Sequence, residues 1–158
     1  MCLVIDANVF CAVFCATSKE HTKFEPIKRW VTKGAGFIVY GGTKYKDELR
    51  KASKYMGFFT ELSRKNKVKM INDQIVDQHQ ALVETIAGNS CDDHHIIAIF
   101  RASQCRLFCS NDKRADEHIK NRHLYPKGQK IPSIYRDIRH KRLLCKRNIV
   151  PIQNQVRP

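Results

Sequence analysis

The chain has 158 residues, of which 42% are hydrophobic, and 29 Lys and Arg against 15 Asp and Glu give a formal net charge of +14. This length and apolar content predict a globular protein with a buried core and exclude an intrinsically disordered chain. No apolar run approaches the ~20 residues of a membrane span, and the start lacks the pattern of a secretory signal. We therefore expect a cytoplasmic protein without a membrane partner.

The positive charge is concentrated toward the C-terminus. Residues 113–158 contain 13 Lys and Arg against 3 Asp and Glu, whereas residues 1–112 contain 16 against 12. This asymmetry favours a polyanionic partner, most simply nucleic acid, and a solubilising tail is the alternative.

Short apolar strands alternate with helices over most of the chain. In order, the sequence predicts a strand at 3–5, helices at 7–17 and 25–33, a strand at 37–40, helices at 43–55 and 56–65, an edge strand at 68–71, helices at 74–87 and 93–103, a strand at 106–109 and a helix at 113–121. This alternation indicates an α/β fold, a three-layer sandwich around a central, mostly parallel sheet of short strands.

The pattern weakens after residue 122, where Pro and Gly residues interrupt it. We therefore expect a main domain over residues 1–122 and a basic, partly ordered C-terminal extension over 123–158. One further element is expected within 134–144, and an extended segment from residue 148 onward.

The seven cysteines are scattered through apolar segments and form no paired Cys-x-x-Cys pattern. Reduced, buried thiols are the favoured interpretation, and a zinc site is the weaker alternative.

Four acidic residues occupy comparable positions in the predicted elements. Asp6 and Asp112 follow two of the strands, Glu48 lies in the first half of the helix 43–55, and Asp93 opens the helix 93–103. Ligands of open α/β sheets bind at the carboxyl ends of the strands, where these acids are expected to meet. Clustered carboxylates repel one another, so the pattern predicts a hard divalent cation, Mg²⁺ or Mn²⁺. For Asp6 alone, a helix N-cap is the competing interpretation.

The same positions carry a resemblance to the PIN-domain nucleases, which covers about residues 1–121. It rests on LVIDANVF at 3–10, DELRK at 47–51, DDHHIIAIFRAS at 92–103 and LFCSND at 107–112. The resemblance implies a PIN-like fold and a metal-dependent endoribonuclease whose catalytic, metal-binding acids are Asp6, Glu48, Asp93 and Asp112. It also implies a possible toxin role with an antitoxin as protein partner, and a possible homodimer.

Other residues compete for, or assist, these roles. Asp92 is the alternative to Asp93, and Asp47 the alternative to Glu48. Asp116 is one turn beyond Asp112 and is expected on a solvated helix face.

Four polar residues next to the acids are candidates for binding substrate. Asn8 and Ser110 can orient water or a phosphate, although local capping explains them equally well. Lys113 and Arg114 begin the helix after Asp112 and are placed to meet phosphates. His94 and His95 lie beside Asp93, where one of them can protonate a leaving oxygen.

The leading hypothesis is therefore a divalent-metal-dependent endonuclease that hydrolyses phosphodiester bonds, with RNA as the favoured substrate. The alternatives are a non-catalytic nucleic-acid-binding module on the same fold, and a structure-specific nuclease acting on DNA.

Overall fold

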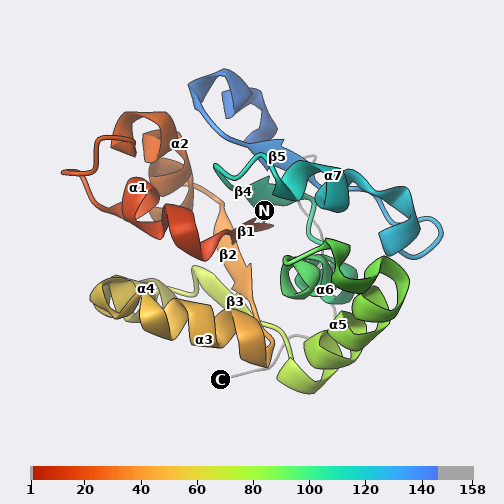
Figure 1. Cartoon of the computed structure of the whole chain (residues 1–158). Helices are drawn as coiled ribbons and strands as arrows, with labels where there is room; N and C mark the ends of the chain where they lie inside the picture. Colours follow the sequence, from red (N-terminus) through yellow and green to blue (C-terminus); the bar gives the residue numbers. More distant parts are fainter. Residues whose placement is uncertain (1, 146–158) are drawn as a thin grey trace.

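A buried parallel strand lies at the centre of the molecule (Figure 1). The computed structural model describes residues 2–145, apart from the side chains of Ser53, Met56 and Asn89. All four residues of β1 (Cys2–Ile5) are buried, as expected for a strand covered on both faces. The extended segment expected from residue 148 lies outside the described residues.

The sheet has five parallel strands in the order β3-β2-β1-β4-β5. The other four strands are β2 (Phe37–Tyr40), β3 (Val68–Met70), β4 (Leu107–Cys109) and β5 (Ser133–Tyr135), of which β3 and β5 are the edge strands. The predicted α/β class and parallel sheet are therefore confirmed, and the strand expected at 68–71 does lie at an edge. β5 pairs with β4 along its whole length, so residues beyond 122 contribute a strand to the sheet.

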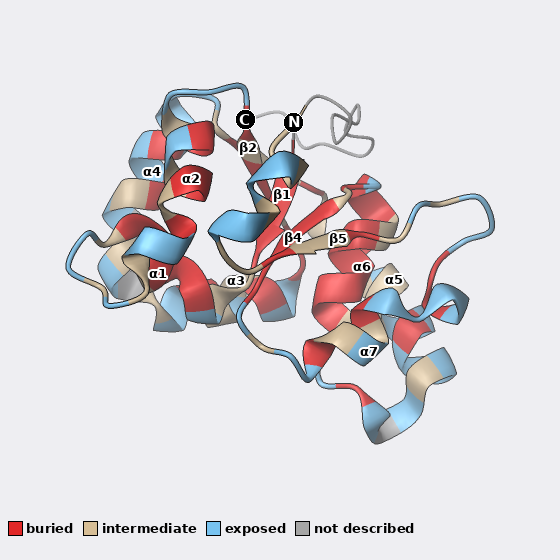
Figure 2. Ribbon diagram, turned by 90° about the horizontal axis from the view of Figure 1, so that it is seen from above, coloured by how far each residue is buried: buried red, intermediate tan, exposed pale blue. Residues whose placement is uncertain are grey.

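Helices cover both faces of this sheet, with α1, α2 and α4 on one side and α5, α6 and α7 on the other (Figures 1 and 2). The α-helices are α1 (Phe10–Phe14), α2 (His21–Thr32), α3 (Thr43–Lys51), α4 (Met56–Arg64), α5 (Asp73–Ala87), α6 (His94–Ser103) and α7 (Ala115–Lys120). Short 3-10 helices are η1 (Ala7–Val9), η2 (Ser53–Tyr55), η3 (Gly88–Ser90), η4 (Arg122–Leu124) and η5 (Ile138–Leu143).

Several element boundaries differ from the sequence predictions. The helix expected over 7–17 is split into η1 and α1 and ends at Phe14. α2 begins four residues earlier than expected and holds Pro26 in its interior. The helix expected over 43–55 ends at Lys51 and is followed by η2. The element expected within 134–144 is in fact a strand and a 3-10 helix.

The N-terminus of α3 is fixed by carboxylates from α5, which determines where this helix lies. The backbone N–H of Gly42 donates to Asp73 Oδ1 at 3.0 Å, and that of Thr43 donates to Asp77 Oδ1 at 2.9 Å. Gly42 has φ +84°, and a Cβ atom there would lie 2.6 Å from Val76 Cγ1. A glycine is therefore required at this turn for the two helices to approach each other.

In the part of the chain that the structure describes, no helix combines the length and apolar composition needed to cross a membrane. All seven cysteines lie within residues 2–145, and they form no disulfide bond.

Candidate functional site

A cavity of about 670 Å³ lies where β1 ends, between η1, α3 and the first turn of α6. Its acidic side chains are Asp6, Glu48, Asp92, Asp93 and Asp112. Its cationic and histidine side chains are Lys44, Lys51, His95, Arg114 and His118. All four acids predicted from the sequence thus line a single cavity, although they come from four separate segments.

Parallel pairing of β1 with β4 brings Asp6 next to Ser110. Ile5 is paired with Cys109, and the N–H of Asp6 donates to the carbonyl of Cys109 at 2.9 Å. Ser110 is fully buried, and its hydroxyl donates to Asp6 Oδ2 at 2.8 Å. The other oxygen, Asp6 Oδ1, accepts the backbone N–H of Asn8 at 3.0 Å and so caps η1.

Asp112 is held by an arginine two residues further along the chain. The backbone N–H of Arg114 donates to Asp112 Oδ1 at 2.8 Å, and its guanidinium donates to Oδ2 at 2.7 Å. These hydrogen bonds lower the pKa of Asp112. The Arg114 side chain is 91% exposed, so the pair is readily accessible to solvent and to ligands.

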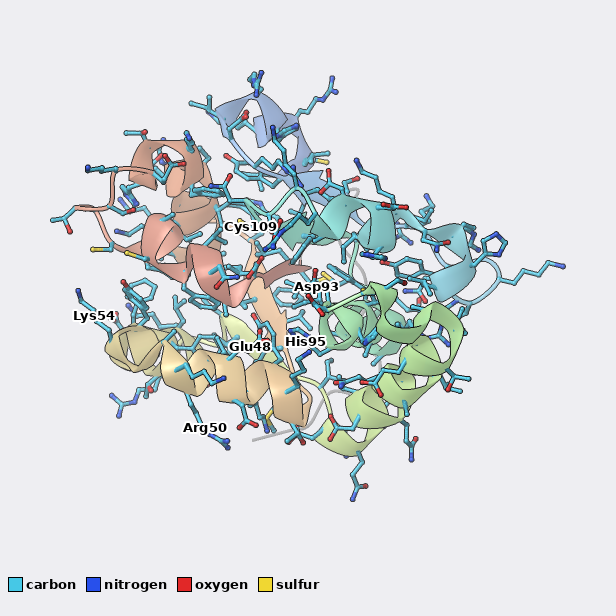
Figure 3. The ribbon with its side chains drawn as sticks, in the orientation of Figure 1. Glu48, Arg50, Lys54, Asp93, His95 and Cys109 are labelled. Atoms are coloured by element: carbon cyan, nitrogen blue, oxygen red, sulfur yellow. The ribbon has the colours of Figure 1, made fainter. Side chains whose placement is uncertain are left out.

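Glu48 meets a buried histidine across the cavity. His95 Nε2 lies 3.0 Å from Glu48 Oε2, and Figure 3 shows the two side chains converging from α3 and α6. Burial acts to raise the pKa of Glu48, but the hydrogen bond and charge of His95 oppose it, and the pKa lies below its ordinary value.

Asp93 immediately precedes α6, and the pKa of its carboxyl group is affected by the other three predicted acids. Burial raises its pKa; the carboxylates of Asp6, Asp112 and Glu48 add to the rise, and His95 opposes it. Within residues 2–145 its side chain makes no capping hydrogen bond to α6. Asp92 also lines the cavity but is exposed, and its carbonyl accepts from Lys44 Nζ at 3.0 Å.

The donor set is suited in kind to a hard divalent cation, because carboxylates that destabilise one another's charge are relieved by a bound metal. As the side chains stand, no three His, Cys, Asp or Glu residues within 2–145 are arranged so that they could hold a metal ion. Asp112 in particular is engaged by Arg114. A cation bound by Asp112 would replace its ion pair with Arg114.

The remaining predicted residues divide between the cavity and other places. Asn8 and Arg114 line the cavity, whereas Lys113 is exposed outside it, and Ser110 is buried beneath Asp6. Asp47 forms an ion pair with Arg50 on the outer side of α3.

Asp116 is not on a solvated face, since it pairs with Arg136, whose side chain is only 15% exposed. Its carboxylate does not line the cavity.

Sequence reasoning did not identify the cavity residues Lys44, Lys51 and His118. The two lysines could have been identified from the sequence, because with Glu48 they lie at positions i, i+4 and i+7 of one predicted helix and therefore share a face. His118 could not have been identified in this way, since its position at the cavity depends on how α7 packs against the rest of the protein.

Comparisons of the chain with protein-family models, with curated proteins and with solved structures find no match.

Proposed function

We propose that the protein is a divalent-metal-dependent endonuclease that hydrolyses phosphodiester bonds, with RNA as the favoured substrate. The observation that carries this proposal is the convergence of Asp6, Glu48, Asp93 and Asp112 on one cavity. The effect of the other three carboxylates on the pKa of Asp93 supports it, because such mutual repulsion calls for a cation.

Mg²⁺ or Mn²⁺ would be held by these four carboxylates, directly or through water. Such a cation supplies charge neutralisation for the phosphate and acidifies a water molecule. In the overall hydrolysis, the water oxygen forms a bond to phosphorus, the bond to the leaving oxygen breaks, and that oxygen gains a proton. Ser110 holds the Asp6 carboxylate in place through its hydroxyl hydrogen bond.

The cations on the cavity wall provide the means of holding a polyanion. Lys44 and Lys51 come from α3, and Arg114 from the segment before α7, so the positive side chains of the cavity wall come from two separate segments. Contacts of this kind hold phosphates without reading sequence. A nucleic acid strand is the substrate class that matches an acidic centre flanked by cations.

The preference for RNA, and the assignment to the PIN-domain nucleases, rest on the resemblance of the four sequence segments. The order of the acids along the chain and the parallel α/β sheet support this assignment. The same resemblance extends the proposal to a toxin-type ribonuclease with a protein partner, and to a homodimer.

The direct test measures cleavage of fluorescently labelled single-stranded RNA by the purified full chain, with Mn²⁺ or Mg²⁺ and with EDTA. Wild-type protein is expected to cleave only with the divalent ion. Asp6→Asn should reduce cleavage to background while the protein stays folded, because Asn is as good a capping residue as Asp for η1.

Asp47→Asn provides the matched control, since it makes the same chemical change on α3 outside the cavity and should leave cleavage unchanged. Full cleavage in EDTA would contradict the metal mechanism. Salt-dependent binding of RNA without cleavage under any divalent ion would instead indicate a non-catalytic binding module. A DNA oligonucleotide of the same sequence distinguishes the two substrates.

A further inference from the structure

The floor of the cavity contains a buried imidazole whose role the proposed chemistry leaves open. His95 is only 3% exposed, and it lies in the first turn of α6, two residues after Asp93. Its Nε2 is 3.0 Å from Glu48 Oε2, which makes it the described partner of that carboxylate from across the cavity (Figure 3).

The chemistry of this pair fixes which atom donates the proton. An ionised carboxylate can only accept hydrogen bonds, so Nε2 of His95 is the donor. The hydrogen bond uses Oε2 of Glu48 and leaves the second carboxylate oxygen for another ligand. Glu has three rotatable side-chain bonds, and a hydrogen bond from a buried ring removes much of that freedom.

The ring itself is held firmly. It packs against Tyr45, with ring centroids 6.4 Å apart, and the Tyr45 hydroxyl donates to the carbonyl of Ile5 in β1. Tyr45 is fully buried. The imidazole therefore packs against α3, through a residue that is itself tied to the end of the central strand.

A packing role alone does not explain a histidine at this position. Nδ1 of His95 is buried and has no hydrogen-bond partner among residues 2–145. A buried polar atom without a partner destabilises the fold, and an aliphatic side chain of similar size would avoid that penalty. The Nε2 hydrogen bond to Glu48 is the polar contact that an aliphatic side chain at this position could not make.

We propose that His95 is a positioning residue that holds the Glu48 carboxylate in the orientation needed to bind the divalent cation. This inference rests on the proposed function. Because Asp93 is the N-cap residue of α6 and His95 lies in its first turn, the hydrogen bond also restrains Glu48 relative to Asp93. Partners of metal ligands typically contribute about 10–100-fold to metal affinity.

The test compares two neutral amides that differ in reach. His95→Gln can place an N–H donor near the position of Nε2, whereas the shorter side chain of His95→Asn cannot reach Glu48. Mn²⁺ binding to the full chain is measured by isothermal titration calorimetry, with melting temperature and near-UV circular dichroism as checks of folding. Mn²⁺ affinity should fall about 10–100-fold in His95→Asn and stay near the wild-type value in His95→Gln.

RNA cleavage supplies a second readout. In His95→Asn, cleavage should be lost at limiting Mn²⁺ and largely recovered at saturating Mn²⁺, with the KM for RNA unchanged. Equal Mn²⁺ affinity in both folded variants, whether normal or reduced, would overturn the positioning role. A wild-type protein that binds no Mn²⁺ would instead overturn the proposed function, so the two failures are distinguishable.

Discussion

Both carboxylate oxygens of Asp6 are engaged by neighbours within the protein. Oδ1 accepts the N–H of Asn8, and Oδ2 accepts the hydroxyl of Ser110. The capping role and the cavity role of Asp6 are therefore not alternatives, because the residue caps η1 while it lines the cavity. Capping fixes the carboxylate at the end of β1, which is what a metal ligand requires.

Arg114 forms an ion pair with Asp112, with Nη2 and Oδ2 2.7 Å apart. The Arg114 side chain is 91% exposed and that of Asp112 28%, so the ion pair contributes little to stability. Release of Arg114 would free Asp112 for a cation and free the guanidinium for a phosphate.

The stability of the protein at acid pH is predicted to depend on His79, a residue of α5 that does not line the cavity. Burial lowers the pKa of His79, and the charge of Arg101 lowers it further. The unfolded chain therefore takes up this proton first, at its ordinary pKa of about 6.5, and stability falls as the pH drops below that value. His79→Gln should show a smaller loss of melting temperature between pH 7.5 and 5.5 than wild type.

His123→Gln serves as the control for this experiment, because His123 is exposed on η4. Equal losses of melting temperature in wild type and His79→Gln would show that His79 does not govern the acid sensitivity.

At the scale of single elements, one face of α3 lines the cavity. Lys44, Glu48 and Lys51 all line the cavity, and the first turn of the helix is held by Asp73 and Asp77 from α5. Along this face of the helix, Glu48 lies between the two lysines. Substrate phosphates next to the scissile bond are their expected partners.

Lys51→Ala is therefore expected to weaken RNA binding in the non-cleaving Asp6→Asn background. The dependence of log Kd on log salt concentration should also become shallower by about one unit, because one phosphate contact is lost. Fluorescence anisotropy at several salt concentrations measures both effects.

Lys54→Ala removes the same charge from a residue that points away from the cavity (Figure 3). If Lys54→Ala weakened RNA binding as much as Lys51→Ala, overall charge rather than the α3 face would determine affinity.

At the scale of the whole molecule, the basic segment after residue 122 contributes to the core. Tyr135 in β5 is fully buried, packs against Phe24, and donates its hydroxyl hydrogen to the carbonyl of Lys23 at 3.1 Å. β5 also covers the edge of β4, the strand that leads to Ser110 and Asp112. Residues 133–135 are thus part of the folded unit that supports the cavity.

Tyr135→Ala should lower the free energy of unfolding by about 3–5 kcal/mol, because it leaves a large cavity in the core. That loss is a large fraction of the ~5–15 kcal/mol that stabilises a typical domain. Urea unfolding followed by circular dichroism measures it.

Ile138→Ala, three residues further on, is the matched control, since Ile138 is 60% exposed. It should change stability by no more than about 0.5 kcal/mol. A Tyr135→Ala variant as stable as wild type would show that β5 does not contribute to the core.

The first four strands and the positions of the four acids were predictable because both depend on local pattern, whereas β5 was not predicted as a strand. β2 was predicted with its observed bounds, since an apolar run between glycine turns is typical of a buried strand. Asp6 and Asp112 stood out because each follows a strand, Asp93 because it opens a helix, and Glu48 because it lies in the helix that follows the second strand. Parallel α/β topology then brings such positions to one edge of the sheet.

The partners of those acids were decided only by the tertiary structure. Ser110 meets Asp6, and His95 meets Glu48, across sequence separations of 104 and 47 residues. Periodicity reports which face a residue occupies, but not which side chain from another element lies opposite. Contacts of this kind depend on strand register and helix packing, and they determine which carboxylates are held, which are neutralised and which remain available to a cation.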